Sequence, residues 1–529
     1  MTSAVVADGP IPGPVPETFN MVELLLELHG TAGRRDLPSL YYRDEILTYA
    51  QLIQRANRVG NGLRQLGVRR EQRVLMALPD SPAFVATFLG AMKIGALPVP
   101  VTTLARSADY HYFLQDSRAR VLVVSAELWP IFQPFIGEIP TLRATVLVGH
   151  RKTPELSWEE LVENSSPQLE CEPTYRDAMS YWLYSSGTTG RPKAVIHLHQ
   201  DMVHCTWPFL REVAPLSESD RIFSTAKMEF SYGLVNSLYL PLLTGASAVL
   251  LPERPEPARV LETLRRYRPT VFFSVPTTYL RLLHFIDREK PMVDFSSLRL
   301  CISAGEPLPP WLFQQWRDRF DLEILDGLGS TEVGYIYLGS RPGQARPGSC
   351  GALLPGFEGK LVDEHGEAVA AGEVGELWVK AESTAAGYWH EEAKTRENFL
   401  GVWFRTGDML SQEADGSYRF VSRRDDLFKV AGHWVSPLEV EEVLLGHRAV
   451  AESAVVGLPD AHGLLKPRAY VQLKDGMASA DLGQELREFV KARLEPFKMP
   501  QWIEFVPSLP RTPTGKIQRA RLREMQKAV

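Results

Sequence analysis

Apolar strand-like runs alternate with helix-like stretches between about Leu47 and Gly334, and this alternation restricts the fold more than any other feature of the chain. The strand-like runs cover residues 73–78, 120–125, 144–149, 246–251, 270–275 and 298–303, and the helix-like stretches include residues 81–95, 257–267 and 277–286. Uniformly apolar strands separated by helices are typical of α/β layers with largely parallel sheets. In such folds, ligands bind at the carboxyl ends of the strands.

A chain of 529 residues exceeds the size of one hydrophobic core, so we expect more than one domain. After Ala345, glycines and short β-like runs continue to Val421 and predict a small β lobe. A dense charge cluster and a short α/β tail follow, and residues 437–445 of this tail predict a helix. The predicted fold class is α/β. It has a large N-terminal domain of layered sheets and a β lobe over residues 1–422, a joint at residues 423–427 and a smaller α/β C-terminal domain over residues 428–529.

Charge and composition argue against several classes of protein. The formal net charge of -6 is unsuited to a nucleic-acid binder that relies on counterion release. The most apolar stretch, residues 83–101, contains Lys93, two glycines and two prolines, and predicts a buried helix followed by a strand rather than a membrane span. Residues 1–19 lack the basic start and apolar core of a secretory signal. We expect a cytoplasmic protein without nucleic-acid or membrane partners.

A loop rich in glycine and hydroxyl groups, YSSGTTGRPK, occupies residues 184–193 and follows an aromatic, strand-like run at residues 179–183. Backbone N–H groups and hydroxyls donate to anionic oxygen, and a lysine supplies a mobile positive charge, so the loop suits a triphosphate. Its glycine spacing differs from that of the GxxxxGK[ST] loop. The candidate phosphate-binding residues are Ser185, Ser186, Gly187, Thr188, Thr189 and Lys193. A polar surface turn is the alternative for this loop taken alone.

Three further segments carry polar groups of the same kind. DGLGSTE at residues 326–332 offers Thr331 to a phosphate and Glu332 to a hydrated magnesium ion that shields the triphosphate. RTGD at residues 405–408 places Asp408 on a turn, where a carboxylate suits the two donors of a ribose diol. PRTPTGKIQR at residues 510–519 presents Lys516 on a loop shaped by proline and glycine. Taken singly, these segments would be better explained as surface turns and a solvated lysine.

In this order, the four segments resemble the acyl-adenylate-forming (ANL) superfamily, which includes acyl-CoA ligases, amino-acid adenylation domains and beetle-type luciferases. The resemblance covers nearly the whole chain and extends to GAMKIGA at residues 90–96 and SAGE at residues 303–306. It implies a large N-terminal domain, a small mobile C-terminal domain and two half-reactions. A carboxylate attacks the α-phosphate of ATP and expels diphosphate, and a thiol then attacks the acyl-adenylate. The implied cofactors are ATP, Mg²⁺ and the co-substrate coenzyme A.

The resemblance also implies roles for individual residues. Thr331 would contact the α-phosphate, and Glu332 would serve magnesium. Lys516 would bridge carboxylate and phosphate oxygens, where its charge stabilises the transition state more than the ground state. Asp408 would hold ribose, with Arg423 beside it.

Other implied positions concern the hinge, the nucleotide base and the thiol. Asp425 would be the hinge about which the small domain rotates. The chain departs from the family pattern at Ser422, where a glycine is usual, so the hinge geometry could differ. The remaining implied positions are Ala304, Gly305 and Glu306 beside adenine, Asp326 in the nucleotide site and Gly432 on the pantetheine path.

The acid-binding region includes Ser231. Superfamily members that load α-amino acids usually carry an aspartate at this position, and an ammonium group buried without a carboxylate would be costly. An α-amino acid is therefore disfavoured, although Glu229 nearby weakens the argument slightly. Ser231 could instead bond a ring substituent or a water molecule.

Residues 227–240, with Tyr335 and Ile336, resemble benzoate-CoA ligases and their aryl relatives. By this resemblance, Tyr232, Tyr335 and Ile336 would form flat walls for an aromatic ring. Gly233 and Gly334 would leave space for the ring, and the hydroxyl of Tyr335 could bond a substituent. Core packing is an equal alternative for any one of these side chains.

The leading hypothesis is an ATP-dependent aryl-carboxylate-CoA ligase, an AMP-forming acid–thiol ligase, with anthranilate (2-aminobenzoate) as the first candidate acid and benzoate as the next. The partners would be a small aromatic carboxylic acid and coenzyme A. A protein that loads the aryl group onto a separate carrier protein is one alternative. A non-catalytic nucleotide-binding protein is another, and a luciferase-like oxygenase remains open.

Overall fold

The computed structural model describes residues 14–31, 33–149, 155–185, 191–431, 433–460, 462–474, 476–479, 481–511 and 517–525. The chain divides into two compact units. The first contains the described residues of 1–185, 192–358 and 380–404, and the second is built mainly from those of 359–379 and 405–529. The predicted α/β class, with a large N-terminal part and a smaller C-terminal part, is confirmed. The boundary at residue 422 and the hinge at residues 423–427 remain predictions.

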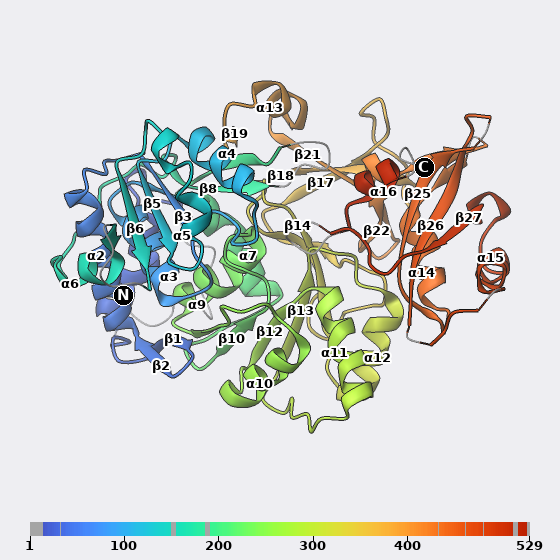
Figure 1. The fold of residues 1–529 in the computed structure, drawn as a ribbon, viewed down its shortest axis with the longest axis horizontal. Helices are drawn as coiled ribbons and strands as arrows, with labels where there is room; N and C mark the ends of the chain where they lie inside the picture. Colours follow the sequence, from blue (N-terminus) through green and yellow to red (C-terminus); the bar gives the residue numbers. More distant parts are fainter. Residues whose placement is uncertain are drawn as a thin grey trace. The chain divides into compact units, whose positions relative to one another are not determined.

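A nine-stranded sheet forms the centre of the first unit (Figure 1). Its order is β16 (Ala352–Leu353), β15 (Ile336–Gly339), β14 (Ile324–Gly329), β13 (Leu300–Ala304), β12 (Val271–Ser274), β10 (Arg221–Ser224), β11 (Ser247–Leu250), β1 (Pro38–Tyr42) and β2 (Glu45–Thr48). The strands from β14 to β1 are parallel to their neighbours, and β2, β15 and β16 pair antiparallel. The predicted runs at residues 246–251, 270–275 and 298–303 coincide with three of the buried parallel strands.

Helices between these strands supply the core beside the sheet. They are α7 (Asp201–Glu212), α8 (Ser231–Leu234), a π-helical turn at Val235–Tyr239, α9 (Leu240–Thr244), α10 (Pro257–Tyr267), α11 (Pro276–Glu289) and α12 (Pro310–Phe320). Phe272 of β12, Tyr279 of α11 and Trp316 of α12 lie in one buried apolar cluster. Burial of such large side chains is the main favourable term that holds the helices against the sheet.

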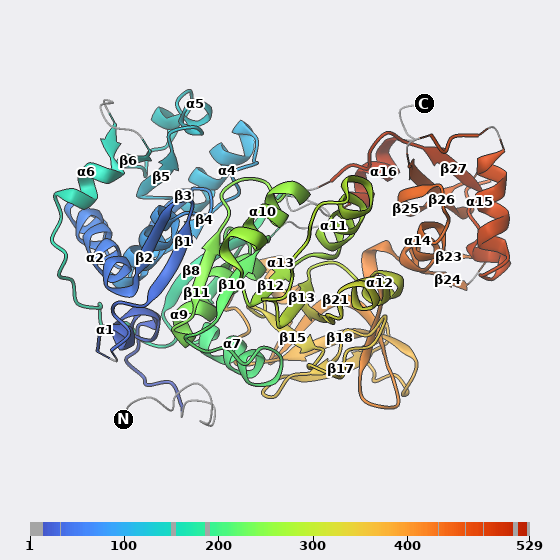
Figure 2. The ribbon, with the colours of Figure 1, turned by 90° about the horizontal axis from the view of Figure 1, so that it is seen from below.

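A second sheet of the same unit is entirely parallel, in the order β4 (Leu97–Pro100), β3 (Arg73–Ala77), β5 (Val121–Ser125), β6 (Ala144–Val148) and β7 (Leu156–Ser157) (Figure 2). Its helices are α2 (Tyr49–Gln65), α3 (Pro82–Lys93), α4 (Ser107–Ser117), α5 (Trp129–Phe132) and α6 (Trp158–Glu163), and α1 (Leu28–Thr31) precedes β1. The apolar stretch 83–101 forms α3 and β4, as predicted, and every residue of both elements is buried. None of the helices described is long and apolar enough to cross a membrane.

A three-stranded sheet carries the glycine-rich loop. Strand β8 (Met179–Ser185) pairs antiparallel with β9 (Lys193–Leu198), which also pairs with β19 (Gly387–Tyr388). The strand predicted at residues 179–183 is therefore confirmed, and the chain returns directly along β9. Ser185 and Lys193 face each other across this hairpin, so the two ends of the loop are fixed by strand pairing.

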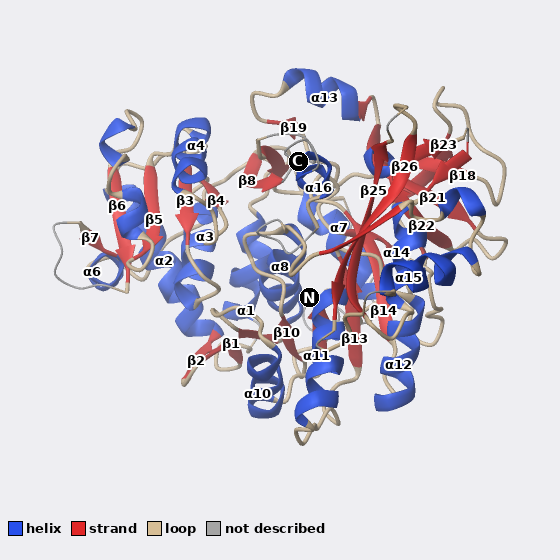
Figure 3. Cartoon of the chain, turned by 45° about the vertical axis from the view of Figure 1, so that its right-hand side comes forward, coloured by secondary structure: helices blue, strands red, loops and turns tan. Residues whose placement is uncertain are grey.

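The second unit is rich in antiparallel strands. Its strands include β17 (Glu358–Val362), β18 (Val374–Lys380), β21 (Trp403–Gln412) and β22 (Tyr418–Arg423). The short strand β20 (Phe399–Leu400), which pairs with the start of β21, and α13 (Glu392–Asn398) before it belong to the first unit. The C-terminal part contains β23 (Phe428–Val430), β24 (His433–Val435), β25 (Val450–Pro459), β26 (Leu465–Leu473), β27 (Trp502–Phe505), α14 (Pro437–Leu445), α15 (Leu482–Lys491) and α16 (Arg519–Met525) (Figure 3). The helix predicted at residues 437–445 has the observed bounds.

Candidate functional site

Two of the predicted segments meet at Tyr388. The Tyr388 hydroxyl donates to Oε1 of Glu332 at 3.0 Å, and Nζ of Lys193 lies 4.1 Å from the centre of the Tyr388 ring. The N–H of Ala385 donates to the carbonyl of Glu332 at 2.8 Å. Residues 385–388 therefore join the start of β9 to the loop after β14. Sequence reasoning missed this third segment, although its aromatic pair after Gly387 could have indicated it.

The surroundings of Lys193 are partly dehydrated. Burial lowers the pKa of its ammonium group, and the carboxylate of Glu332 acts in the opposite direction. The face of the Tyr388 ring attracts the cation as well. A cation and a carboxylate held this close are suited to a metal-bound triphosphate, because the lysine can contact phosphate oxygen while the glutamate faces the metal.

A buried histidine fixes the backbone of the second segment. Nε2 of His197 donates to the carbonyl of Thr331 at 2.7 Å, and Nδ1 lies 2.9 Å from Oδ2 of Asp201. Both side chains are fully buried, and burial raises the pKa of Asp201 while its hydrogen bond to His197 opposes the shift. Because the carbonyl can only accept, Nε2 carries one proton, and a second proton is shared between Nδ1 and Oδ2. Neither residue was predicted from the sequence.

Several predicted nucleotide-binding residues lie at the carboxyl ends of β8, β13 and β14. Ser185 ends β8, and its buried hydroxyl has no partner among the described residues. Asp326 pairs in register with Ser303 of β13, and its Oδ1 is likewise buried without a described partner. Burial raises the pKa of Asp326 well above its usual range. The free hydroxyl of Ser185 can donate to a phosphate oxygen, and the free oxygen of Asp326 can accept from a ligand N–H group, such as that of an adenine base.

The segment after β13 has a further structural role. Ala304 ends the strand and Gly305 adopts a positive φ of 88°. Oε2 of Glu306 accepts hydrogen bonds from the N–H and the hydroxyl of Thr277, at 3.2 and 2.6 Å. Because Thr277 lies in the first turn of α11, the carboxylate also satisfies a helix N-terminus.

The predicted acid-binding residues form an aromatic cluster, defined here as Phe209, Tyr232, Phe273 and Tyr335. The rings of Tyr232 and Tyr335 are stacked with centres 6.1 Å apart, and Phe209 and Phe273 meet them edge-on. Tyr335 is buried and Tyr232 is partly exposed. Ile336, also buried, begins β15 next to the cluster. The structure therefore brings the predicted aromatic side chains together in one cluster, and their binding of an acid stays a prediction.

The polar groups beside this cluster already have protein partners. The hydroxyl of Ser231 donates to the carbonyl of Gly334, and that of Tyr335 donates to Oδ1 of Asn236. The hydroxyl of Tyr232 lies 3.3 Å from the carbonyl oxygens of Ser274 and Ile302. A hydroxyl whose proton is committed can still accept a hydrogen bond through its oxygen.

The two glycines of this region have steric reasons for lacking a side chain. A Cβ at Gly233 would lie 2.1 Å from the carbonyl oxygen of Lys227. Gly334 has a φ of 91°, and a Cβ there would lie 3.1 Å from Cε of Met202. The close approach of the backbone explains Gly233 by itself, so this glycine is no sign of open space for a ring.

The second unit holds the predicted ribose-binding pair. Asp408 and Arg423 face each other on β21 and β22, and Nη1 of Arg423 lies 2.5 Å from Oδ1 of Asp408. The N–H of Asp408 also donates to the hydroxyl of Thr406 at 3.0 Å. The structure thus brings the predicted pair together within one sheet.

The predicted hinge lies beside a cluster of charges. Asp425 is exposed, and the next residue, Asp426, pairs with Arg523 of α16 at 2.9 Å and with Arg519 at 3.6 Å. Arg519 also pairs with the buried Glu441 of α14 at 2.7 Å. The remaining predicted site residues, Ser186, Gly187, Thr188, Thr189, Gly432 and Lys516, lie outside the described residues.

Hydroxyls, a lysine and a carboxylate at the ends of strands in an α/β fold are the groups expected of a nucleotide-binding enzyme. Residues 29–389 match the family described as AMP-binding enzyme, and residues 439–516 match the AMP-binding enzyme C-terminal domain. The chain belongs to the AMP-binding enzyme family. The resemblance to the acyl-adenylate-forming superfamily is thereby confirmed.

Similar proteins narrow the class further. The chain is 44% identical over 513 residues to a benzoate-CoA ligase of Thauera aromatica, with 96% of each chain covered. It is 39% identical to the anthranilate CoA ligase AuaEII, solved in complex with anthranoyl-AMP, with a TM-score of 0.92 and 97% and 98% of the two chains covered. It is also 39% identical to a benzoate CoA ligase from Burkholderia xenovorans LB400, with a TM-score of 0.88 and 96% and 100% covered. The predicted class, an AMP-forming acid–thiol ligase, is confirmed.

The hydroxyl of Tyr388 generates a first prediction. Tyr388→Phe removes the donor to Glu332 but keeps the ring beside Lys193, so the carboxylate loses a fixed orientation worth about 1 kcal/mol. We expect the Mg²⁺ concentration for half-maximal ATP–diphosphate exchange to rise roughly fivefold, since 1.4 kcal/mol corresponds to a factor of 10. Phe399→Leu, which alters the packing around Tyr388 and keeps the hydroxyl, is the control. An unchanged Mg²⁺ requirement in Tyr388→Phe would refute this role.

The two nitrogens of His197 can be tested separately. Glutamine places an amide nitrogen near the position of Nε2, and asparagine places one near Nδ1. His197→Gln can keep the bond to Thr331, whereas His197→Asn keeps only the bond to Asp201. We expect exchange activity to be at least about tenfold higher in His197→Gln, because misplacement of a contact residue lowers the rate steeply. Equal losses in two folded variants would mean that the Thr331 contact does not matter.

Glu229 generates a prediction about pH. It is buried in the first unit, and burial, with the charge of Asp80, raises its pKa to about 8. The typical pKa of a glutamate in an unfolded chain is about 4.3. Between these values the folded chain holds a proton that the unfolded chain has released, so stability is full below the lower pKa and falls as pH rises through the higher one.

Glu229→Gln should abolish this loss, because the amide stays neutral. The free energy of unfolding of the variant minus that of the wild type should increase by at least about 1.4 kcal/mol from pH 5 to pH 8. This is the free energy that corresponds to a pKa difference of about one unit between the folded and unfolded chains. Urea unfolding at the two pH values measures it. A constant difference between variant and wild type would show that Glu229 is ionised in the folded chain.

Proposed function

We propose that this protein is an ATP-dependent aryl-carboxylate-CoA ligase that works through an aryl-adenylate. Membership of the AMP-binding enzyme family and the named activities of the relatives support the reaction class. The aromatic cluster carries the proposal for this chain, because stacked Tyr232 and Tyr335 rings beside a nucleotide-binding region suit a flat aromatic acid.

In the first half-reaction, a carboxylate oxygen of the acid attacks the α-phosphorus of ATP, and diphosphate leaves. The nucleotide would enter as its magnesium complex, with Glu332 facing the metal and Thr331 the α-phosphate. Lys193 and the hydroxyl of Ser185 would meet phosphate oxygens, and Asp408 would hold the ribose. The hydrogen bonds from His197 and Tyr388 support these roles, because they hold the Thr331–Glu332 segment before substrate binds.

In the second half-reaction, the thiol of coenzyme A attacks the acyl carbon and AMP leaves. Lys516 would act in the first half-reaction, where negative charge builds on the carboxylate and phosphate oxygens, and Gly432 would line the path of the pantetheine. Rotation about Asp425 would separate the two steps. A separate carrier protein is the alternative acceptor, and addition of coenzyme A to the preformed aryl-adenylate distinguishes the two.

Anthranilate is the proposed acid, with benzoate next. The proton of the Ser231 hydroxyl is committed to the carbonyl of Gly334, which leaves the oxygen as an acceptor. An aniline nitrogen offers two N–H donors and is uncharged near neutral pH, so it needs no carboxylate partner. Benzoate would use the same aromatic surfaces without this hydrogen bond.

A panel of carboxylic acids, scored by formation of the CoA thioester, tests the function. We expect kcat/KM to be highest for anthranilate, lower for benzoate and negligible for short aliphatic acids, with Lys516→Ala as the inactive control. Failure of every aromatic acid to release diphosphate from ATP would refute the aryl-ligase proposal.

Ser231→Ala tests the choice of acid separately. Loss of one hydrogen bond of about 1 kcal/mol should lower kcat/KM for anthranilate roughly fivefold and leave that for benzoate within about twofold. Tyr335→Phe, which loses a hydroxyl bonded to Asn236, is the matched control for removal of a hydroxyl from the same cluster. An equal effect of Ser231→Ala on both acids would show that Ser231 does not recognise the amino group of anthranilate.

A further inference from the structure

A cavity of about 200 Å³ lies in the first unit, lined by Gln72, Arg73, Arg118, Arg120 and Thr141. These residues gather at the amino-terminal edge of the five-stranded parallel sheet. Arg73 begins β3, Arg120 directly precedes β5, and the N–H of Arg120 donates to the carbonyl of Arg73 at 2.8 Å. Arg118 follows the last residue of α4. Several candidate nucleotide residues, such as Ser185, Ala304 and Thr331, lie instead at or just after the carboxyl ends of strands.

The cavity has three guanidinium groups and no described carboxylate that pairs with them. Arg73 donates to the carbonyl oxygens of Ser117 at 2.5 Å and Glu71 at 3.1 Å. Nε of Arg120 is buried without a hydrogen-bond partner among the described residues. Burial and the neighbouring charge of Arg118 lower the pKa of Arg73. Like charges crowded in this way favour an anion between them.

Two nearby carboxylates do not form described ion pairs with the three arginines of the cavity. Oδ2 of Asp116 accepts a hydrogen bond from Tyr184 at 2.7 Å, although the charge of Arg118 still influences its pKa. The side chain of Glu71 is exposed, and only its main-chain oxygen contacts Arg73. A chain with a net charge of -6 therefore contains a local excess of positive charge at this edge.

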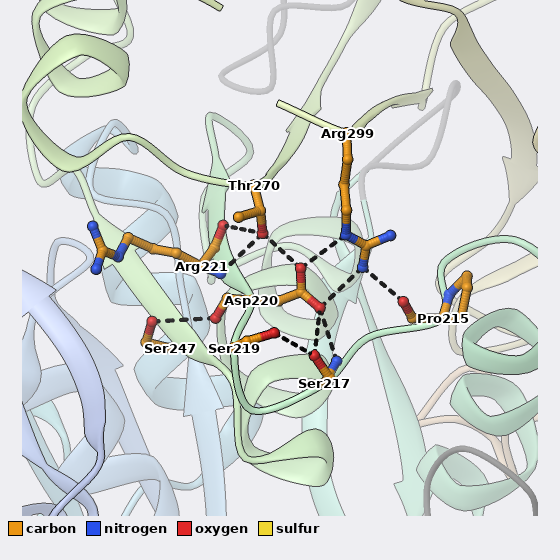
Figure 4. Close-up of polar contacts among 8 residues, drawn as sticks. All are labelled: Pro215, Ser217, Ser219, Asp220, Arg221, Ser247, Thr270 and Arg299. Atoms are coloured by element: carbon orange, nitrogen blue, oxygen red, sulfur yellow. Dashed lines mark hydrogen bonds and ion pairs between the residues drawn. The ribbon is translucent and has the colours of Figure 1, made fainter. Parts of the chain in front are cut away.

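The larger sheet provides an internal comparison. At its amino-terminal edge, Asp220 accepts hydrogen bonds from Nε and Nη2 of Arg299, both at 2.9 Å, and from the hydroxyl of Thr270 at 2.7 Å (Figure 4). The N–H of Ser217 donates to Asp220 as well, at 2.8 Å. There, the arginine before a parallel strand has a carboxylate of the chain as its partner. At the smaller sheet the arginines lack this partner, so an anion from solution would take its place.

Arg73 is held in position by aromatic rings. Its guanidinium carbon lies 5.3 Å from the ring centre of Trp182 and 5.6 Å from that of Trp389, and the two rings are 4.6 Å apart. Nε1 of Trp389 donates to the carbonyl of Asp116 at 3.0 Å, which fixes that ring. A preorganised guanidinium loses less conformational entropy when it binds an oxyanion.

We propose that this cavity binds a diphosphate group. Guanidinium groups match the oxygens of phosphate in paired hydrogen bonds, and the amide of Gln72 and the hydroxyl of Thr141 supply neutral partners. The cavity volume of about 200 Å³ leaves room for a diphosphate group. The group can come from free diphosphate or from a nucleoside diphosphate whose base and sugar stay in solvent.

Calorimetric titration at constant ionic strength tests this site, with sodium diphosphate, inorganic phosphate and ADP as separate probes. Arg118→Gln and Arg120→Gln each remove one cation of the cavity, and because Arg118 is exposed its replacement should leave the fold intact. Arg288→Gln removes the same charge from a side chain that is 72% exposed and remote in sequence, and serves as the control.

We expect the wild type and Arg288→Gln to bind diphosphate alike, and both cavity variants to lose one equivalent or to bind it at least tenfold more weakly. Diphosphate that binds at the candidate nucleotide site should bind equally to both cavity variants. Absence of binding at that site would therefore not change the test of the cavity. Tighter binding of ADP than of diphosphate, lost in the same variants, would identify a nucleotide as the source. Identical diphosphate binding by the wild type and both cavity variants would overturn the proposal.

Discussion

The buried imidazole of His197 joins the two segments on which the candidate nucleotide site depends. It stands on β9, directly after the glycine-rich loop, and holds the carbonyl of Thr331 from a position 134 residues away in the chain. Asp201 fixes the ring from the other side. Because the side chains of His197 and Asp201 are fully buried, water does not compete for their hydrogen bond, and His197 holds the segment after β14 before any substrate binds.

Hydrogen bonds within the protein also hold Ser231 and the aromatic cluster, and there they join uncharged groups. The hydroxyls of Ser231, Tyr232 and Tyr335 all lie beside acceptors of the protein, which fixes the orientation of the rings and leaves oxygen lone pairs toward any further donor. These contacts support the proposal of an aromatic acid that carries an uncharged donor.

The two parallel sheets of the first unit differ at their amino-terminal edges. Asp220 neutralises Arg299 at one edge, whereas Arg73, Arg118 and Arg120 meet at the other without a described carboxylate partner. Strand starts in such folds are usually concerned with stability rather than with ligands, because the carboxyl ends hold the reactive groups. An excess of guanidinium groups at the opposite edge is therefore a property of this chain that its reaction does not require.

The sequence by itself determined the α/β class, the buried helix and strand at residues 83–101 and the helix at residues 437–445, because the spacing of apolar residues and the composition of turns are local properties. It also placed Asp408 and Arg423 together by resemblance, and strand pairing joins them. Only the tertiary structure decided that His197 holds Thr331, that Tyr388 links Lys193 to Glu332 and that three arginines share a cavity. These contacts join residues far apart in the chain, and no local pattern of polarity records which distant side chains strand pairing and packing will bring within hydrogen-bonding distance.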